Sequence, residues 1–216
     1  MKVLIISGGQ VDIGQLKNYV QENDYHRIIA ADSGLAVCRE AGIVPTEILG
    51  DFDSLKDPDM IEQYKKRGVP VRTFPERKDY TDTDLAMHHA CEHEPEQIDI
   101  FGATGSRMDH TMANIFNLSL LAERGIKCRL VDSHNQIEML KGPCEKVYER
   151  REDLPFFSLL ACSERVEGLT LKGFSYPLEA FCLERSVSIG ISNYLTEKKG
   201  TLRFEEGFLL VIRSRD

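Results

Sequence analysis

The chain has 216 residues, enough for one large domain or two small ones, and its 42% hydrophobic and 29% charged residues are typical of a globular protein. Its net charge of −8 argues against a binder of nucleic acid or of anionic membranes, since both need an excess of Lys and Arg. No apolar run reaches the roughly 20 residues of a membrane span, and the N-terminal run is too short for a signal peptide. Because the six cysteines contain no C-x-x-C pair, we expect reduced thiols and a cytoplasmic protein.

The first 133 residues alternate short apolar runs with helical patterns. The strand-like runs are residues 2–9, 26–34, 46–54, 69–76, 97–105 and 127–133. The helical patterns are residues 13–23, 35–42, 58–68, 81–93 and 109–125. Gly42 and Gly68 are expected to end two of these helices. Apolar strands separated by helices predict a doubly wound, mostly parallel α/β sheet with helices on both faces.

From about Asp132 the pattern changes to short β-type runs separated by Gly, Pro and Asn. The runs are residues 135–142, 146–152, 155–163, 165–173, 179–192, 200–207 and 208–214. No long helical period is present, so this part is predicted to be an all-β domain, a sandwich or a small barrel. The predicted domains are residues 1–134 and 135–216.

Polar residues follow four of the predicted parallel strands at their carboxyl ends. The four loops are residues 31–34, 50–54, 78–84 and 102–110, and they carry Asp, Gly, Ser or Thr and one Arg. In a doubly wound sheet, ligands bind beyond the carboxyl ends of the strands. The sequence therefore predicts a ligand site on this rim.

Asp51 and Asp53 are the candidate metal ligands of the second loop. An extended backbone would aim both carboxylates to one side while Phe52 packs the other way. Two such oxygens, with Ser54 nearby, suit Mg²⁺, which takes few carboxylates and leaves room for phosphate. The alternative is that Asp53 or Ser54 caps the next helix.

The third loop, "KDYTDTD", combines an expected helix cap with further acids. Thr81 is a good N-cap, and Asp84 is best explained by the helix dipole. Asp79 and Asp82 are candidates to complete a metal shell or hold its waters. Lys78 could neutralise a phosphate.

The fourth loop, "GATGSRMDH", is a glycine-containing turn that opens a helix. Gly102 and Gly105 let backbone N–H groups approach an anion, and Arg107 offers a two-pronged contact to phosphate. Asp109 either caps the helix or orients Arg107. The loop is not a P-loop, because it lacks the G-x-x-x-x-G-K-[ST] pattern.

Four histidines, His88, His89, His93 and His110, raise the question of a zinc site. None belongs to an H-E-x-x-H or comparable pattern. We expect His89 and His93 to lie on a solvated helix face.

Taken together and in this order, the loops resemble the thiamine pyrophosphokinase (thiamine diphosphokinase) family, especially its bacterial form. The resemblance rests on Ala31-Asp32-Ser33-Gly34, Gly50-Asp51-Phe52-Asp53-Ser54, Asp79-Tyr80-Thr81-Asp82, Gly102-Ala103-Thr104-Gly105-Ser106-Arg107-Met108-Asp109-His110, Gly173-Phe174-Ser175-Tyr176-Pro177-Leu178 and Gly190-Ile191-Ser192-Asn193. Each piece is weak alone, but the combination is specific and spans essentially the whole chain.

The resemblance implies a catalytic α/β domain, a C-terminal β-sandwich and a homodimer with thiamine bound between the subunits. It assigns Asp51, Asp53 and Asp82 to magnesium, and it places Asp79 and Arg107 around the triphosphate. Other residues of the nucleotide site would be Asp32, Ser33, Gly34, Lys78, Thr81, Gly102, Thr104, Gly105 and Asp109. Ser192 and Asn193 would contact thiamine.

The implied reaction transfers pyrophosphate from Mg-ATP to the hydroxyl of thiamine, giving thiamine diphosphate and AMP. One of the magnesium carboxylates or Asp79 would accept the hydroxyl proton. One alternative is a pyrophosphokinase of the same fold that acts on another hydroxymethyl acceptor, such as a pterin. Others are a non-catalytic nucleotide-sensing module and a metal-dependent phosphatase, although "DFDSL" lacks the last position of D-x-D-x-[TV].

Two features depart from the family pattern. Ser106 stands where many relatives have Gly, which requires a negative φ at this position. The chain has no Trp, so an aromatic wall for thiamine would have to come from Tyr194 or a Phe.

Overall fold

The computed structural model describes residues 1–55, 57, 59–75 and 79–216. They form two compact units, residues 1–117 with 126–133 and residues 118–125 with 134–216. Each unit has its own hydrophobic core.

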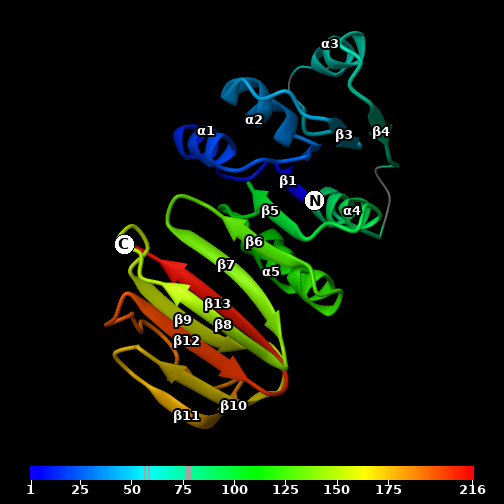
Figure 1. Ribbon diagram of the computed structural model, residues 1–216. Coiled ribbons are helices and arrows are strands. Elements are labelled where there is room, and N and C mark those ends of the chain that lie inside the picture. The colour runs from blue at the N-terminus through cyan, green and yellow to red at the C-terminus, as the bar shows by residue number, and fades with distance from the viewer. Residues whose placement is uncertain (56, 58, 76–78) are drawn as a thin grey trace. The chain divides into compact units, whose positions relative to one another are not determined.

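The first unit is built on a parallel sheet with the strand order β4-β3-β2-β1-β5-β6 (Figure 1). The strands are β1 (Lys2–Ile6), β2 (Arg27–Ala31), β3 (Glu47–Gly50), β4 (Val71–Thr73), β5 (Gln97–Phe101) and β6 (Lys127–Val131). Every neighbouring pair among them is parallel, which confirms the predicted sheet. From β1 the chain first winds outward to β4 and then returns to the other side of β1 as β5. The carboxyl ends of β1 and β5 therefore form the topological switch point, where ligands bind in such sheets.

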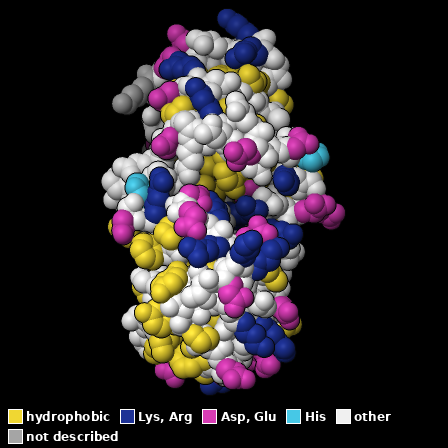
Figure 2. Space-filling view, turned by 60° about the vertical axis from the view of Figure 1, so that its left-hand side comes forward, with side chains coloured by type: hydrophobic (Ala, Val, Ile, Leu, Met, Phe, Trp, Pro, Cys, Tyr) yellow, Lys and Arg dark blue, Asp and Glu magenta, His cyan; other side chains and the backbone are white. Residues whose placement is uncertain are grey.

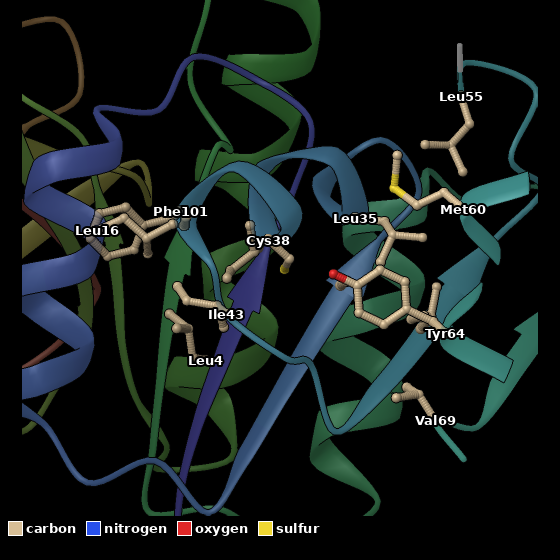
Figure 3. Close-up of a cluster of buried hydrophobic side chains, with 14 of the residues drawn as sticks. Leu4, Leu16, Leu35, Cys38, Ile43, Leu55, Met60, Tyr64, Val69 and Phe101 are labelled. Atoms are coloured by element: carbon tan, nitrogen blue, oxygen red, sulfur yellow. The ribbon is translucent and has the colours of Figure 1, made fainter. Parts of the chain in front are cut away.

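The helices of this unit are α1 (Ile13–Glu22), α2 (Gly34–Ala41), α3 (Asp59–Lys66), α4 (Asp82–Cys91) and the first part of α5 (Met108–Glu123). Leu4 and Ile6 of β1 belong to a core cluster with residues of α1, α2 and α3. Figure 3 shows Leu35 of α2 beside Met60 and Tyr64 of α3 in this cluster. Helix α4 instead packs against β1, β2 and β3 without joining this cluster. Alternate strand residues point to opposite faces, so the sheet is covered on both sides.

The local helix signals of the sequence are confirmed. Gly42 follows α2 in a left-handed conformation with φ 69°, and Gly68 ends the turn after α3 with φ 82°. The side chain of Thr81 accepts a hydrogen bond from the backbone N–H of Asp84, as expected of an N-cap.

The second unit is an antiparallel sandwich. Its strands are β7 (Asn135–Lys141), β8 (Cys144–Glu149), β9 (Phe156–Ala161), β10 (Arg165–Lys172), β11 (Leu178–Glu184), β12 (Lys199–Phe204) and β13 (Phe208–Ser214). β13 pairs with β7 and β9, while β10 and β12 lie between β11 and β8 in the other layer. Side chains from both layers, such as Leu159 and Val211 facing Leu169 and Leu202, share one core. The predicted all-β sandwich is therefore confirmed.

Two expected strands are shorter than their sequence pattern. β4 contains only three residues, two of them exposed. β11 ends at Glu184, and the chain continues in turns that include Ser192, at φ 58°, a value that a strand does not accommodate. All six cysteines are free thiols, as predicted. None of the described helices is long and apolar enough to span a bilayer.

Candidate active site

A pocket of 660 Å³ opens at the switch point of the first unit. The loops that follow β1, β2, β3 and β5 line it, together with the first turns of α4 and α5. Of the predicted site residues, its lining includes Asp32, Ser33, Asp51, Thr81, Asp82, Gly102, Thr104, Gly105 and Arg107. Asp53, Asp79 and Asp109 lie near this lining in sequence but are not part of it, and Gly34 is buried beneath it.

Three carboxylates, two of them in the lining of this pocket, lie close together. Asp32, Asp51 and Asp53 each offer a carboxylate oxygen, and these oxygens all lie within 4.8 Å of one another. Ser54 donates its hydroxyl to Oδ2 of Asp32, while Oδ1 of Asp32 is buried with no hydrogen-bond partner among the described residues. Three negative groups this close repel one another unless a cation lies between them.

The backbone of this acidic loop differs from the sequence expectation. Phe52 has φ 64°, so Asp51, Phe52 and Asp53 do not form the extended segment that we expected. Instead, Oδ1 of Asp51 accepts the N–H of Asp53 at 3.3 Å, and the tight turn brings the two carboxylates together. The alternative of helix capping is wrong, because α3 begins only at Asp59. A positive φ at a bulky residue is strained, and such strain is concentrated at functional sites.

The donor set of this group fits a hard divalent cation. All three donors are carboxylate oxygens, the type that Mg²⁺ prefers, and the unpartnered Oδ1 of Asp32 has a buried lone pair to satisfy. Asp82, predicted as a third ligand, lines the same pocket from α4 but is not a member of this group. Asp32 therefore joins Asp51 and Asp53 in this group, and the metal role of Asp82 stays a prediction.

The segment at the start of α4 contributes the N-cap residue and one carboxylate to the pocket. Thr81 and Asp82 line the pocket, whereas Asp79 is exposed outside it. Burial raises the pKa of Asp84, and His88 at 3.5 Å lowers it by less. Lys78 lies outside the described residues.

Arg107 and Asp109 form a two-pronged pair at the start of α5. Nε and Nη2 of Arg107 donate to the two oxygens of Asp109, at 3.2 and 2.5 Å. This pair lowers the pKa of Asp109 to about 2, helped by the backbone N–H of His110, and raises that of Arg107. Asp109 thus orients Arg107, one of the two roles that the sequence left open. Arg107 itself belongs to the lining of the pocket.

Sequence reasoning missed the loop that follows β1. Ser7, Gly8, Gly9 and Gln10 all line the pocket. The N–H of Gly9 donates to the carbonyl of Gly102 at 2.8 Å, and that of Gln10 to the carbonyl of Thr104 at 3.0 Å. The loops after β1 and β5 are thus joined backbone to backbone. The Gly-Gly pair at the end of the first strand was the available signal.

We predict that Gly9→Val disrupts this junction. A Cβ at position 9 would lie 2.4 Å from the carbonyl oxygens of both Gly102 and Thr104, so backbone has to move. Overpacking of this kind destabilises by about 1–3 kcal/mol, and we expect the KM for the ligand of this pocket to rise at least about tenfold. Steady-state kinetics measure the KM, and thermal unfolding measures the loss of stability. Gly14→Ala, in α1 near only the Asp12 side chain, is the control and should leave the KM unchanged without lowering the unfolding temperature.

In the second unit, Asn193 is buried and its amide ties two loops together. Its Oδ1 accepts the N–H groups of Tyr176 and Tyr194, at 3.1 and 2.9 Å, and its Nδ2 donates to the carbonyl of Tyr176. Its backbone forms a bridge with Phe157. The neighbouring Ser192 is exposed and receives support through its N–H, which donates to Oγ of Ser158. Asn193 therefore positions the loop that presents Ser192.

Two family models match these two units. "Thiamin pyrophosphokinase, catalytic domain" matches residues 16–130, and "Thiamin pyrophosphokinase, vitamin B1 binding domain" matches residues 146–209. A curated thiamine pyrophosphokinase of Bacillus subtilis (strain 168) is 37% identical over 213 residues, 98% of each chain. The chain belongs to the thiamin pyrophosphokinase family.

Solved structures of thiamin pyrophosphokinases share the whole fold. The Bacillus subtilis structure has a TM-score of 0.90 at 36% identity, with full coverage of both chains. The Geobacillus thermodenitrificans structure has a TM-score of 0.86 at 31% identity and covers 100% and 98% of the two chains. The catalytic-domain match begins at residue 16, after the loop of Ser7 to Gln10. That loop nevertheless lines the pocket, although the family model does not cover it.

The structure explains how the chain accommodates Ser106, and it shows which aromatic side chains are exposed in a chain that has no Trp. Ser106 is not among the five described non-glycine residues with positive φ, so its side chain is tolerated. Tyr194 and Tyr176 are both exposed, at 46% and 62%, on either side of the Asn193 amide. Both rings are therefore accessible to a ligand of the second unit.

The prediction that His89 and His93 lie on a solvated face is wrong for His89. His89 is only 5% exposed and lies between Glu47 and Glu92, and His93 is half-buried beside it. The prediction failed because α4 packs its C-terminal half against the sheet. The helical period of this segment is weak, so the sequence did not reveal which side is buried.

Proposed function

We propose that this thiamin pyrophosphokinase family member transfers the pyrophosphoryl group of Mg-ATP to the hydroxyl of thiamine. The observation that carries the proposal is the close group of Asp32, Asp51 and Asp53, because two of its members, Asp32 and Asp51, line the same pocket as Arg107. Carboxylates that hold a cation, next to an arginine that binds phosphate, are what transfer of a phosphorylated group requires. The pocket volume of 660 Å³ lies within the roughly 300–1,000 Å³ of small-molecule sites.

In this proposal the phosphates bind between the acidic group and the loop after β5. Backbone N–H groups around Gly105 and the guanidinium of Arg107 would bind phosphate oxygens, at the N-terminus of α5. Asp32, Asp51 and Asp53 would hold Mg²⁺, which neutralises phosphate charge when bound. The chain's own contribution is to hold the triphosphate in line with the acceptor.

The proposed reaction forms one bond and breaks one. The thiamine oxygen attacks the β-phosphorus, the bond from that phosphorus to the bridging oxygen of the α-phosphate breaks, and AMP leaves with the bond's electron pair. The hydroxyl proton passes to a carboxylate. We propose Asp82 for this step, because it lines the pocket outside the group of three, whereas Asp79 lies outside the lining.

We further propose that residues 1–134 act as the catalytic domain and residues 135–216 as the thiamine-binding domain of a cytoplasmic homodimer. Ser192 is exposed and is surrounded in sequence by exposed Ile189, Ile191 and Tyr194. Figure 2 shows exposed hydrophobic side chains gathered on the face of the second unit that is turned to the viewer. An apolar surface with a few fixed polar groups suits a flat heterocycle.

A coupled assay of AMP release tests the proposed reaction. We expect AMP formation that requires both Mg²⁺ and thiamine, and equal amounts of AMP and thiamine diphosphate. A pterin alcohol in place of thiamine should give no AMP above background, which separates the thiamine enzyme from a pterin pyrophosphokinase. AMP release with the pterin and not with thiamine would overturn the proposal. Nucleotide binding without turnover of either acceptor would instead indicate a sensing module.

We predict that Asn193→Ala weakens thiamine binding selectively. The change removes three partly buried hydrogen bonds that join the loops at Tyr176 and Tyr194 and leaves the backbone groups of both tyrosines without this partner. We expect the KM for thiamine to rise roughly tenfold or more, with the KM for ATP unchanged. Asn18→Ala, on the exposed side of α1, is the matched control. An equal rise in both KM values would contradict the assigned role.

A further inference from the structure

A second cluster of metal-ligating side chains lies away from the pocket. Glu47, His89 and His93 each offer one ligand atom, and these atoms all lie within 4.8 Å of one another. Glu47 is the first residue of β3, whereas the pocket lies beyond the last residue of that strand. A strand rises about 3.3 Å per residue, so the two ends of β3 lie about 10 Å apart. The cluster is therefore distinct from the acidic group of the pocket.

The outer contacts of this cluster orient its ligand atoms. Nδ1 of His89 lies 3.0 Å from a carboxylate oxygen of Glu92, and Nε2 lies 2.6 Å from Oε2 of Glu47. The other oxygen of Glu47 accepts from Arg27 at 3.1 Å. A metal-bound histidine usually donates its second nitrogen to such a carboxylate, which fixes the ring and its tautomer. Glu92 and Arg27 thus stand where outer-shell partners of a metal site would stand.

His89 faces a carboxylate at each ring nitrogen, although a neutral imidazole has only one N–H to donate. Either the ring carries a positive charge, or a cation takes the place of the proton between His89 and Glu47. His89 and Glu47 are both only 5% exposed, whereas the side chain of Glu92 is 63% exposed, so the contact between His89 and Glu47 is the buried one.

His93 favours the cation. Its Nε2 is buried and has no hydrogen-bond partner among the described residues, and its ring stands edge-on to that of His89, with centroids 5.3 Å apart. A protonated His89 leaves this nitrogen unsatisfied, which is unfavourable in a buried position. A metal ion shared by His89, His93 and Glu47 satisfies all three groups at once.

We propose that Glu47, His89 and His93 bind one divalent transition-metal ion of the Zn²⁺ class. Two imidazoles and a carboxylate suit Zn²⁺ better than Mg²⁺, which prefers oxygen donors only. His89 and His93 are four residues apart, a spacing that puts both on one face of a helical turn.

Binding requires only a small adjustment. Metal–ligand bonds of about 2.0–2.2 Å place tetrahedral ligand atoms about 3.4 Å apart, so the 2.6 Å contact between His89 and Glu47 has to open by about 0.8 Å. His93 is half-buried and lies just beyond the end of α4, which leaves a route for entry. The ion would join α4 to the amino end of β3 and stabilise the fold without touching the substrates.

The test measures zinc binding by the 216-residue chain after treatment with a chelator. Equimolar Zn²⁺ is added in the presence of excess Mg²⁺, so that the acidic group of the pocket is occupied, and bound zinc is measured after gel filtration. We expect one Zn²⁺ per chain and an absorption-edge spectrum with two imidazole ligands. We also expect a rise in Tm of about 5 °C when free Zn²⁺ is well above its Kd.

Variants assign the ligands. His93→Ala, at a half-buried position, should weaken zinc binding more than tenfold, and Glu92→Gln by about 10–100-fold. His88→Ala on the same helix and Asp51→Asn in the pocket are controls and should keep full zinc binding. No zinc bound to the wild-type chain, or equal binding by wild type and His93→Ala, overturns the proposal and leaves a charged His89 as the explanation of the network. Loss of zinc in Asp51→Asn would assign the ion to the pocket instead.

Discussion

Asp51→Asn should lower kcat/KM for thiamine pyrophosphorylation by about 10³-fold, the scale on which a charge-stabilising group acts in phosphoryl transfer. The amide keeps the shape of the side chain and can still accept the N–H of Asp53, so the turn should survive. What it removes is one negative charge from the group that it forms with Asp32 and Asp53. The Mg²⁺ concentration for half-maximal rate should rise as well. Initial rates of AMP release over a Mg²⁺ series measure both effects.

The same segment supplies a matched control. Asp57 forms an exposed ion pair with Arg39 at 2.7 Å and does not line the pocket. Exposed pairs of this kind contribute about 0–1 kcal/mol to stability, so Asp57→Asn should leave kcat/KM unchanged. A rate for Asp51→Asn within tenfold of the wild type, or an equal loss in both variants, would refute the assignment of Asp51.

Arg107→Ala should lower kcat/KM by about 10²–10³-fold, because it removes the only arginine in the described lining of the pocket. Arg107→Lys keeps the charge but not the planar fork that binds Asp109 with two hydrogen bonds. We therefore expect the lysine variant to recover less than a tenth of the lost activity. Arg124→Lys, on the exposed turn after α5, is the control. Full activity of Arg107→Lys would show that charge alone suffices at this position.

The Arg107–Asp109 pair also leads to a prediction about pH. The pKa of Asp109 is lowered from 3.8 to about 2, so the ionised pair is fully formed above about pH 4 and is lost only as the pH falls through about 2. Any fall in activity between pH 7 and pH 4 must then come from other groups. We expect Asp109→Asn and the wild type to show the same acid limb of kcat/KM in that range. A displaced limb in the variant would contradict this pairing.

Much of the site could be predicted from local sequence. Asp51, Asp53 and Arg107 stand in loops whose position after apolar strands places them on one rim, whatever the order of those strands. The caps at Gly42 and Thr81 depend only on neighbouring residues, and the structure has both. These features are local, so a pattern of a few residues contains the information that determines them.

What the sequence did not predict depends on contacts between distant segments. The loop after β1 lines the pocket because β1 is the strand from which the sheet winds in both directions, and strand order is not written in any one segment. Asp32 joins Asp51 and Asp53 because β2 and β3 are neighbours, and because Phe52 adopts a positive φ that a hydrophobic side chain rarely has. His89 is buried against Glu47 because α4 crosses β3, although the segment itself shows no clear apolar face.

By itself, therefore, the sequence determined the chemical groups, the class of the two folds and the rim that carries the site. The tertiary structure decided which carboxylates lie close together, which glycine allows two loops to meet and which histidine is buried. The physical reason is that residue type and spacing set local conformation, whereas side-chain partnership is set by packing across the sheet, between residues far apart in the chain.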